Sequence, residues 1–474
     1  MSVRELLQTN EEGAIEKFKK EIEPLKLTPG ARDKLISMFR AAFSPSVAQE
    51  SEITWDYVKP LTANEQFPYE NLPEPTNPAD LLKELVVCKL NGGLGTTMGC
   101  TFPKSLIVCQ NGQTFFDLTI EQIRDFNNKY HVDVPLVLMQ SFYTDELMKP
   151  SIEKAQSSGV RVLAYNQNKF PRIYEDTLEP VPKSADAPLS EWNPPGHGDV
   201  FHCLRDSGLL DKFLAEGKKY MFISNIDNLG ARIDLKILNK VSTENRSYAA
   251  ETVAKTPDDW KGGMPILYKG RVKLLETAQV PKGHMDDFCN VKIFDIFNSN
   301  NMWINLPKLK EALDKDTLVL DVIKNRKVYN GKNIFQLEAA AGSAIQSFPD
   351  SISVKVPRRR FLPVKSCNEL LLMRSDLYRR EGAEFLINPE RGNTVLPSLK
   401  LSSFFTKVQD FEQRVPSPPS IVHLNKLVVD GDVTFGKNIT LEGDVEFKCP
   451  EGEKWVVPDG KKYKDVVIAS KDKL

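Results

Sequence analysis

The sequence predicts an α/β protein with a mostly parallel sheet, preceded by a helical region and followed by a region of short strands. Three patterns support this expectation. Residues 1–45 carry apolar side chains at helical spacing, short β-rich runs alternate with helical stretches from about residue 81, and a five-residue pattern repeats near the C-terminus. Strand–helix alternation is typical of a sheet that is covered on both faces and binds ligands beyond the carboxyl ends of its strands.

The N-terminal region is expected to be helical because its apolar residues recur at three- and four-residue spacing, as in Ile15, Phe18 and Ile22. Residues 60–80 contain five prolines. Such a density favours extended chain and marks a boundary. We therefore expect three parts: a helical region with its proline-rich boundary at 1–78, a central α/β domain at 79–385 and a C-terminal domain at 386–474.

The elements of the central domain follow in order along the chain. The apolar runs predict strands over 85–90, 135–139, 160–165 and 220–224. The stretches between them predict helices near 117–129, 143–157 and 199–216. The first and last of these strands each run directly into polar or glycine-rich residues, which therefore lie at the edge where a ligand is expected.

The C-terminal region has a hexapeptide period. Gly-Asp-Val-Thr-Phe at 431–435 recurs as Gly-Asp-Val-Glu-Phe at 443–447, a shift of two hexapeptide units. Short strands at this spacing suggest the coils of a parallel β-helix. An ordinary pair of hairpin strands is the alternative. A homo-oligomer, if one forms, is expected to use this region, since so small a domain is better suited to positioning subunits than to catalysis.

Composition excludes several classes of protein. Among 474 residues, 63 Lys and Arg balance 64 Asp and Glu, so no overall field attracts a nucleic acid. Seven cysteines form no Cys-x-x-Cys pair, which argues against a disulfide framework or a zinc site and suggests a reducing compartment. The N-terminus lacks the apolar core of a signal peptide, and no run has the length of a membrane span. We expect a cytoplasmic protein without a membrane or nucleic-acid partner.

Residues 90–105 form a glycine-rich loop directly after the apolar run at 85–88. Its glycines, at 92, 93, 95 and 99, can take φ > 0 and let backbone N–H groups approach a phosphate. Pro103 fixes the backbone beside Lys104, which becomes a positioned cation. The pattern fits neither the dinucleotide fingerprint nor the P-loop. It predicts a nucleotide phosphate site of a third type, against the alternative of a plain turn.

Asp227 is the candidate metal ligand. It follows the strand at 220–224 within Ser-Asn-Ile-Asp, where a buried strand emerges opposite the glycine loop. Mg²⁺ usually binds through one or two carboxylates together with substrate phosphates, so one aspartate that faces a triphosphate is enough. A turn or helix-capping aspartate is the alternative.

Two further segments could bind phosphate. Pro194-Pro195-Gly196-His197-Gly198-Asp199 holds an irregular backbone just before a helix, where N–H groups and the imidazole could meet an anion. A structural or solvated histidine is the alternative there. Farther along, three arginines at 358–360 are expected to be solvated or to pair with acidic neighbours, whereas Lys365 ends a buried-looking stretch after a proline, as Lys104 does.

Seven motifs, in this order, resemble the eukaryotic UTP–glucose-1-phosphate uridylyltransferases, also called UDP-glucose pyrophosphorylases. They are Leu-Asn-Gly-Gly-Leu-Gly-Thr-Thr-Met-Gly at 90–99, Pro-Lys-Ser at 103–105, Pro-Pro-Gly-His-Gly-Asp at 194–199, Ser-Asn-Ile-Asp at 224–227, Gln-Val-Pro-Lys at 279–282, Phe-Asn-Ser-Asn-Asn at 297–301 and Arg-Phe-Leu-Pro-Val-Lys at 360–365. The resemblance extends from the N-terminal helices to the C-terminal repeats.

The resemblance implies a Rossmann-like, GT-A-like nucleotidyltransferase core with a mixed, mostly parallel sheet, and a left-handed parallel β-helix after it. It implies transfer of UMP from UTP to glucose 1-phosphate with Mg²⁺, which yields UDP-glucose and pyrophosphate. Two departures are visible, because Phe102 stands where a small residue is expected and Met264 stands where related chains often carry threonine.

The same resemblance assigns residues to roles. The uridine and phosphates would be held by Leu90, Asn91, Gly92 and Gly93, the uracil and ribose by Gln167 and Gly196, and the nucleotide and metal by Asn225 and Asp227. The sugar phosphate would be contacted by His197, Glu276, Asn298 and Asn300, with Gly263 lining the sugar pocket. Lys104 and Lys365 would bind phosphates as the catalytic cations.

The residue inventory suits this chemistry. The nucleophile would be a phosphate oxygen whose second pKa near ~6 leaves it largely deprotonated at neutral pH, so the reaction requires no general base. It requires two polyanions held in line and cations that stabilise the charge on the α-phosphate and the departing pyrophosphate.

Three alternatives stay open at this point. A pyrophosphorylase for N-acetylhexosamine 1-phosphate or for several sugar phosphates would share the loop chemistry. A catalytically silent nucleotide-binding regulator would share the fold, although the presence of both lysines and Asp227 argues against it. A nicotinamide-dependent dehydrogenase is disfavoured by the glycine spacing.

Overall fold

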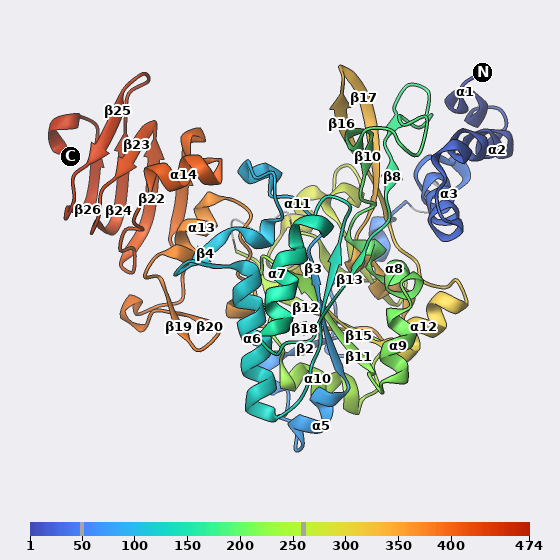
Figure 1. Ribbon diagram of the computed structural model, residues 1–474, viewed down its shortest axis with the longest axis horizontal. Helices are drawn as coiled ribbons and strands as arrows, with labels where there is room; N and C mark the ends of the chain where they lie inside the picture. The colour runs from blue at the N-terminus through green and yellow to red at the C-terminus, as the bar shows by residue number, and fades with distance from the viewer. Residues whose placement is uncertain (48–51, 257–261) are drawn as a thin grey trace.

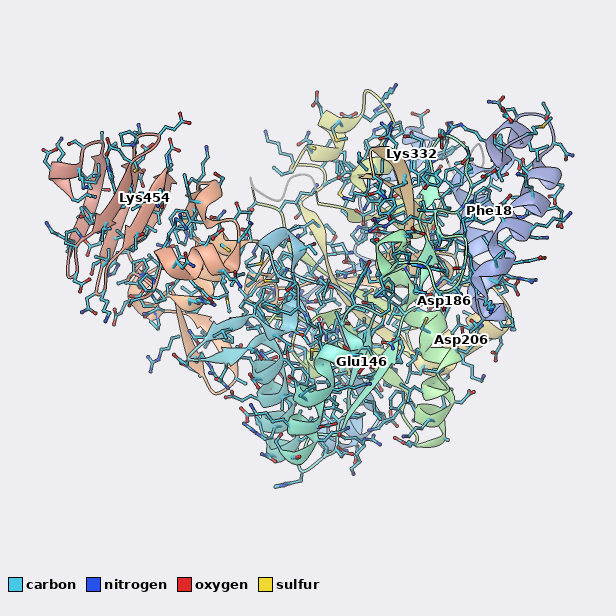
Figure 2. All side chains as sticks on the ribbon, turned by 45° about the horizontal axis from the view of Figure 1, so that its top comes forward. Phe18, Glu146, Asp186, Asp206, Lys332 and Lys454 are labelled. Atoms are coloured by element: carbon cyan, nitrogen blue, oxygen red, sulfur yellow. The ribbon has the colours of Figure 1, made fainter. Side chains whose placement is uncertain are left out.

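The computed structural model describes residues 1–47, 52–256 and 262–474. Figure 1 shows the N-terminal helices at one end of the molecule, a large α/β body in the middle and a stack of short strands at the other end. Figure 2 places Phe18 among the helices of the first end and Lys454 on the strands of the second. The mixed α/β class predicted from the sequence is confirmed, and no helix in these three ranges is long and apolar enough to cross a membrane.

The N-terminal region is helical, as predicted. It comprises α1 (Val3–Leu7), α2 (Glu11–Ile22) and α3 (Pro29–Phe43). Each helix begins at a polar cap, and Phe18 stacks on Phe39 with ring centroids 3.8 Å apart. The buried faces of these helices share one core with Phe170, Trp192 and Leu337 of the central body. The helices are therefore packed onto the body and are not a separate unit.

The central sheet has eight strands in the order β2-β18-β12-β15-β11-β3-β6-β7. Their bounds are β2 (Gln66–Pro68), β3 (Leu85–Leu90), β6 (Leu136–Gln140), β7 (Val162–Asn166), β11 (Tyr220–Asn225), β12 (Tyr248–Ala254), β15 (Ile296–Asn305) and β18 (Ile352–Lys355). Strand β15 runs antiparallel to both of its neighbours, while the other pairs are parallel. The four strands expected from the sequence are all present, and β2 lies within the proline-rich stretch that was expected to be a boundary.

The strands of this sheet alternate their side chains between its two faces, and helices pack on both faces to form two cores. Val86 and Cys88 face one core and Leu85 and Val87 the other. The first core is covered by α8 (Val200–Asp206), α9 (Leu209–Ala215) and α12 (Leu306–Asp314), and the second by α5 (Pro78–Lys83), α6 (Phe115–Tyr130), α7 (Asp145–Ser157) and α10 (Leu235–Thr243) (Figure 1).

The predicted extent of one helix is wrong. The helix expected near 199–216 is divided into α8 and α9 by Gly208, which has φ +75°. This left-handed conformation is readily adopted by glycine and ends the first helix. The break turns α9 so that Leu210 and Phe213 reach the same core as α8.

Small sheets surround the central one. Their strands are β1 (Val58–Lys59), β4 (Val108–Gln110), β5 (Gln113–Thr114), β8 (Phe170–Pro171), β9 (Ile173–Tyr174), β10 (Trp192–Asn193), β13 (Met264–Tyr268), β14 (Arg271–Leu275), β16 (Val322–Tyr329), β17 (Lys332–Ala339), β19 (Tyr378–Glu381) and β20 (Glu384–Ile387). Helix α11 spans Met285–Cys289.

The C-terminal region stacks parallel strands. One sheet contains β21 (Ser398–Leu401), β22 (Leu424–Asp430), β24 (Thr440–Lys448) and β26 (Lys462–Ile468), and a second contains β23 (Asp432–Phe435) and β25 (Lys454–Val457). All pairs in both sheets are parallel. The two sequence repeats fall on β23 and β24, which belong to different sheets, so the alternative of a hairpin pair is wrong.

Part of the central body also packs into the hydrophobic core of the C-terminal region. Helices α13 (Cys367–Arg374) and α14 (Val408–Arg414) pack into it. Met98 and Cys100 of the glycine loop are buried in the same cluster, and Phe102 packs against it. The aromatic ring that was unexpected at position 102 therefore fills the contact between the glycine loop and the C-terminal region.

Candidate active site

The predicted phosphate loop and the candidate metal ligand lie side by side. Strands β3 and β11 are parallel neighbours in which Leu90 pairs with Asn225, so the loops that follow them leave the same edge of the sheet. Lys104 Nζ lies 2.5 Å from Asp227 Oδ2, and both side chains are mostly buried. The expected meeting of these two residues across a strand-end crevice is confirmed.

The glycine loop folds back on itself. Lys104 donates its backbone N–H to the carbonyl of Gly93, and Leu94 bridges to Pro103. Of the four glycines that can take φ > 0, only Gly99 does so in this loop. Gly92 is needed for a different reason: a Cβ atom there would lie 1.9 Å from Gln167 Nε2. The absent side chain thus lets Gln167 reach the loop.

A cavity of about 340 Å³ opens beside this loop. It is lined by Leu90, Asn91, Gly92, Gly93, Lys104, Met139, Gln167, Pro194, Gly196, His197, Asn225, Ile226, Asp227 and Glu338. Every residue that the sequence assigned to the nucleotide is in this set. Asn91 Oδ1 and Gln167 Oε1 are buried and lack a hydrogen-bond partner within the described chain. Since buried polar atoms are normally paired, these two acceptors favour a polar ligand in this cavity, which we call the nucleotide cavity.

The loop that contains Gly196 forms part of the wall of the nucleotide cavity. Its φ is +84° with ψ 167°, a conformation open almost only to glycine, and a Cβ atom there would lie 2.6 Å from the carbonyl oxygen of Ala339. The close approach of β17 therefore requires glycine at this position.

We expect Gly196→Ala to lower the affinity of this cavity for a nucleoside triphosphate about tenfold or more, because the strain of about 1–3 kcal/mol and the clash with Ala339 displace the loop. Titration calorimetry with the nucleotide measures the change. Gly217→Ala is the matched control, since Gly217 also has a positive φ of +79° but open space around its Cβ position. Equal affinity in the two variants would contradict the assigned role of Gly196.

His197 is held in one tautomer. The backbone N–H of Ala341 donates to His197 Nδ1 at 3.0 Å, so the proton of the neutral ring resides on Nε2. Burial lowers the pKa of His197 to about 4, which keeps the ring neutral at physiological pH. The imidazole that the sequence placed near an anion is therefore a neutral hydrogen-bond donor through Nε2.

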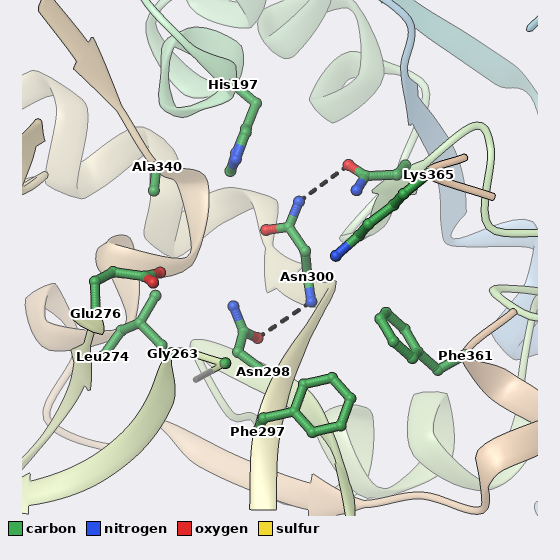
Figure 3. Close-up of a pocket in the computed structure, with 12 residues that line it drawn as sticks. His197, Gly263, Leu274, Glu276, Phe297, Asn298, Asn300, Ala340, Phe361 and Lys365 are labelled. Atoms are coloured by element: carbon green, nitrogen blue, oxygen red, sulfur yellow. Dashed lines mark hydrogen bonds between the residues drawn. The ribbon is translucent and has the colours of Figure 1, made fainter. Parts of the chain in front are cut away.

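A second cavity of about 440 Å³ adjoins the first and shares His197 and Asn225 with it. Figure 3 shows His197, Glu276, Asn298, Asn300 and Lys365 around one space. The full lining is His197, Asn225, Gly262, Gly263, Leu274, Glu276, Phe297, Asn298, Asn300, Ala340, Phe361 and Lys365. Every residue that the sequence assigned to the sugar phosphate lies here, and we call this space the sugar cavity.

An irregularity in β15 places the asparagines of the sugar cavity. The register against β12 shifts where Glu251 pairs with Asn301 and Thr252 with Asn298, and Asn300 has φ +60°. A bulge of this kind re-aims side chains at a functional site. Asn300 Nδ2 donates to Asn225 Oδ1 at 3.0 Å, and the Asn300 N–H donates to Asn298 Oδ1 at 3.3 Å (Figure 3).

Glu276 lies at the far side of the sugar cavity from Lys365. Burial and the nearby carboxylate of Asp321 raise the pKa of Glu276. A Cβ atom on Gly263 would lie 2.3 Å from Glu276 Oε2, so glycine leaves room for this carboxylate. Met264 is fully buried among apolar side chains. Met264, which stands where threonine is expected, therefore packs in a core and lines neither cavity.

The arginine cluster is divided between surface and core. Arg358 and Arg359 lie over aromatic rings, whereas Arg360 is buried and its guanidinium meets Glu251 and Asp234. Arg360 Nε lies 2.8 Å from Glu251 Oε2, and Nη1 lies 3.3 Å from Asp234 Oδ2. The expected pairing with acidic neighbours is therefore confirmed for Arg360, while the solvated alternative does not apply to it.

Several lining residues were missed by sequence reasoning. Glu338 of the nucleotide cavity and Phe297, Ala340 and Phe361 of the sugar cavity were not singled out for a role. Phe297 and Phe361 do fall inside quoted motifs and stand beside predicted residues, which is the signal that could have identified them. Glu338 carries no such signal, because only the approach of β17 to Gly196 brings it to the site.

The candidate metal site consists of one carboxylate. Nowhere in the described ranges do three or more His, Cys, Asp or Glu side chains cluster as a metal cage. Asp227 lines the nucleotide cavity with one ion-pair partner, Lys104. A lone carboxylate beside a phosphate loop fits Mg²⁺, since this ion takes its remaining ligands from phosphates and water.

Comparison with known proteins identifies a family. The family described as UTP–glucose-1-phosphate uridylyltransferase matches residues 36–442. The UTP–glucose-1-phosphate uridylyltransferase of Saccharomyces cerevisiae is 43% identical over 440 residues, which cover 92% of this chain and 88% of that protein. The protein of the same name from Pyrus pyrifolia is 42% identical over 465 residues, 97% of each chain. A solved mutant of the UDP-glucose pyrophosphorylase from Leishmania major, in complex with UDP-glucose, aligns with a TM-score of 0.85 at 31% identity and covers 96% of this chain and 99% of that one.

Proposed function

The chain belongs to the UTP–glucose-1-phosphate uridylyltransferase family, and on this premise we propose that it transfers UMP from UTP to glucose 1-phosphate, forming UDP-glucose and pyrophosphate. One structural observation supports the proposal independently of the family match. Two cavities meet at His197 and Asn225, and each has a lysine, Lys104 in one and Lys365 in the other. This arrangement suits two polyanions that must meet in line.

The nucleotide cavity is assigned to UTP. An amide such as that of Gln167 presents an N–H donor beside a carbonyl acceptor, which match the acceptor and N–H donor on the edge of uracil. The unpaired Gln167 Oε1 supports this assignment. Backbone groups of Leu90, Asn91, Gly92 and Gly93 would face the phosphates, while Gly196 lines the ribose side and Asn225 lies at the junction of the two cavities.

The sugar cavity is assigned to glucose 1-phosphate. Asn298, Asn300 and Glu276 would bind hydroxyl groups, and Gly263 leaves space for the ring. The Nε2–H of His197 points into the cavity from the opposite side and would donate to the sugar phosphate (Figure 3). The substrate phosphate itself is the nucleophile, so these side chains orient it and need not remove a proton.

The two lysines would stabilise the charge of the transition state. Attack on the α-phosphate breaks its bond to the β-phosphate, and pyrophosphate leaves with the bonding electrons. Lys365 lies on the side of the incoming sugar phosphate, and Lys104 on the side of the glycine loop. Positioned ammonium groups lower the barrier because they need not reorganise during the reaction.

We also propose Mg²⁺ as the cofactor, held by Asp227 and by substrate phosphates. The ion would neutralise phosphate charge when it is bound. Mutation of Asp227→Asn should raise the MgCl₂ concentration for half-maximal activity about tenfold or more, because the amide is neutral. Initial rates measured against MgCl₂ provide the test. The surface pair of Asp295 with Lys355 offers a control, since Asp295→Asn should leave the titration unchanged; an unchanged curve for the Asp227 variant would remove it from the metal site.

A pyrophosphate-release assay tests the function. Wild-type protein with UTP and MgCl₂ is expected to release pyrophosphate with glucose 1-phosphate and to do so far more slowly with N-acetylglucosamine 1-phosphate. Preference for the N-acetylated sugar would instead indicate an N-acetylhexosamine enzyme. Binding of UTP without pyrophosphate release would indicate a nucleotide-binding regulator.

The finer architecture is proposed on the same premise. Residues 79–385 would form a GT-A-like nucleotidyltransferase domain after the region 1–78, and residues 386–474 a left-handed parallel β-helix. The all-parallel pairing of the C-terminal strands supports the second assignment. The open edges of this stack would serve any homo-oligomer, and we propose that the enzyme acts in the cytoplasm.

A further inference from the structure

One buried carboxylate joins the two loops that flank the nucleotide cavity. The Asp199 side chain is fully buried and lies two residues after His197. Its Oδ2 accepts the backbone N–H of Asn168 at 2.7 Å, and its Oδ1 accepts Asn168 Nδ2 at 3.2 Å. Asn168 directly follows Gln167. A single side chain therefore connects the loop of Gly196 and His197 with the turn that carries Gln167.

The counter-charge of this carboxylate comes from the N-terminal helices. Lys34 of α3 places Nζ 2.5 Å from Asp199 Oδ1, and its side chain is only 10% exposed. No other ion pair to Asp199 forms within the described ranges. Burial alone would raise the pKa of Asp199, but the Lys34 ammonium and the surrounding hydrogen bonds hold it below its usual range.

The remaining groups around Asp199 are neutral beside Lys34. Cys203 of α8 donates its thiol hydrogen to Asp199 Oδ2 at 3.0 Å and is neutral. His202 Nδ1 lies 3.1 Å from Lys34 Nζ, and burial, followed by the Lys34 charge, lowers the pKa of His202 to about 3. Without Lys34 the carboxylate would be buried and uncompensated, which is a costly state.

We propose that Lys34 is a positioning residue for the nucleotide cavity. Its ion pair with Asp199 fixes the distance between the Gly196–His197 loop and the turn that carries Gln167. The inference rests on the proposed function for its substrate, UTP. Lys34 lies before residue 36, where the family match begins, and it touches neither cavity. The N-terminal helices thereby contribute to substrate binding by means of one ion pair.

The test compares Lys34→Met with Lys34→Arg. We expect the methionine variant to lose about 10- to 100-fold in kcat/KM, mainly through a higher KM for UTP, because a displacement near 1 Å has effects on this scale. The arginine variant keeps the charge and should recover most of the loss. Arg40→Met is the matched control: Arg40 is on the same helix and pairs with Glu12 at 2.8 Å on the surface. Its kcat/KM should stay within about twofold of wild type, since exposed pairs contribute little.

A double variant keeps the inference testable if Lys34→Met does not fold. Lys34→Met with Asp199→Asn leaves no buried unpaired charge, and the amide can still accept the Asn168 N–H. This variant should fold and bind UTP more tightly than Lys34→Met, where the single variant can be measured, and less tightly than wild type.

The possible results separate this inference from the proposed function. Wild-type affinity for UTP in a folded Lys34→Met variant or in the double variant, or an equal loss in Arg40→Met, would overturn the role of Lys34. If the wild-type protein releases no pyrophosphate, the proposed function fails, while UTP titration calorimetry on the same variants still decides the role of Lys34.

Discussion

Mutation of Lys365→Ala is expected to lower turnover by about 100-fold or more while the protein stays folded, since this is the scale for losing one preorganised electrostatic contact. Lys365 is exposed, and no ion pair holds it within the chain that the structure describes. Its ammonium instead extends into the sugar cavity beside Asn300 (Figure 3). Because no carboxylate among the described residues pairs with this ammonium, it is available for a substrate phosphate.

Single-turnover rates of pyrophosphate release give the measurement, with circular dichroism to verify folding. Lys400→Ala is the control, because Lys400 is an exposed lysine on β21, away from both cavities. Lys104→Ala should cause a loss of similar size and also release Asp227 from its ion pair. Near-normal turnover in both cavity variants would contradict the roles assigned to the two lysines.

The positions of the site residues were predictable where a strand and its loop determine them. The apolar run of β3 and the glycines after it located the glycine loop, and β11 located Asp227. Parallel strands bring their carboxyl ends to one edge, which placed Asp227 opposite the glycine loop, and the structure adds that β3 and β11 are direct neighbours with Leu90 paired to Asn225. For Lys104, Lys365 and His197, the prolines and glycines beside them indicated a fixed backbone.

Other features depend on contacts between distant segments and have no local signal. The bulge that aims Asn298 and Asn300 arises from the pairing of β15 with β12, and Glu338 reaches the site because β17 approaches Gly196. Phe102 was unexplained by the sequence because its partner is the C-terminal core. Lys34 was not singled out from the sequence, because only tertiary packing places it against Asp199.

The fate of Arg360 illustrates the same limit. Pairing with acidic neighbours was expected for the three arginines, but the sequence did not show which of them pairs, and the structure places Arg360 in the core between Glu251 and Asp234. Glu251 is fully buried and also accepts Trp303 Nε1 at 2.9 Å and Asn301 Nδ2 at 3.1 Å. These hydrogen bonds tie the ion pair to the sheet just below the sugar cavity.

This network also supports the segment that carries Lys365. The carbonyl of Arg360 accepts Asn301 Nδ2 at 3.3 Å, and the N–H of Leu362 donates to Asn228 Oδ1 at 2.8 Å. The chain then continues through Pro363, which bridges to Asn228, toward Lys365. A change at Arg360 should therefore affect both stability and activity.

We expect Arg360→Met to lower the free energy of unfolding by about 3–5 kcal/mol, because removing one partner of a buried pair leaves the Glu251 charge uncompensated. Urea unfolding followed by circular dichroism measures the loss. Lys315→Met is the control: it breaks an exposed pair with Glu311 and should cost less than about 1 kcal/mol. Adding Glu251→Gln to the Arg360 variant removes the stranded charge and should restore part of the stability. An Arg360 variant as stable as the Lys315 control would show that the guanidinium is not required to stabilise this buried site.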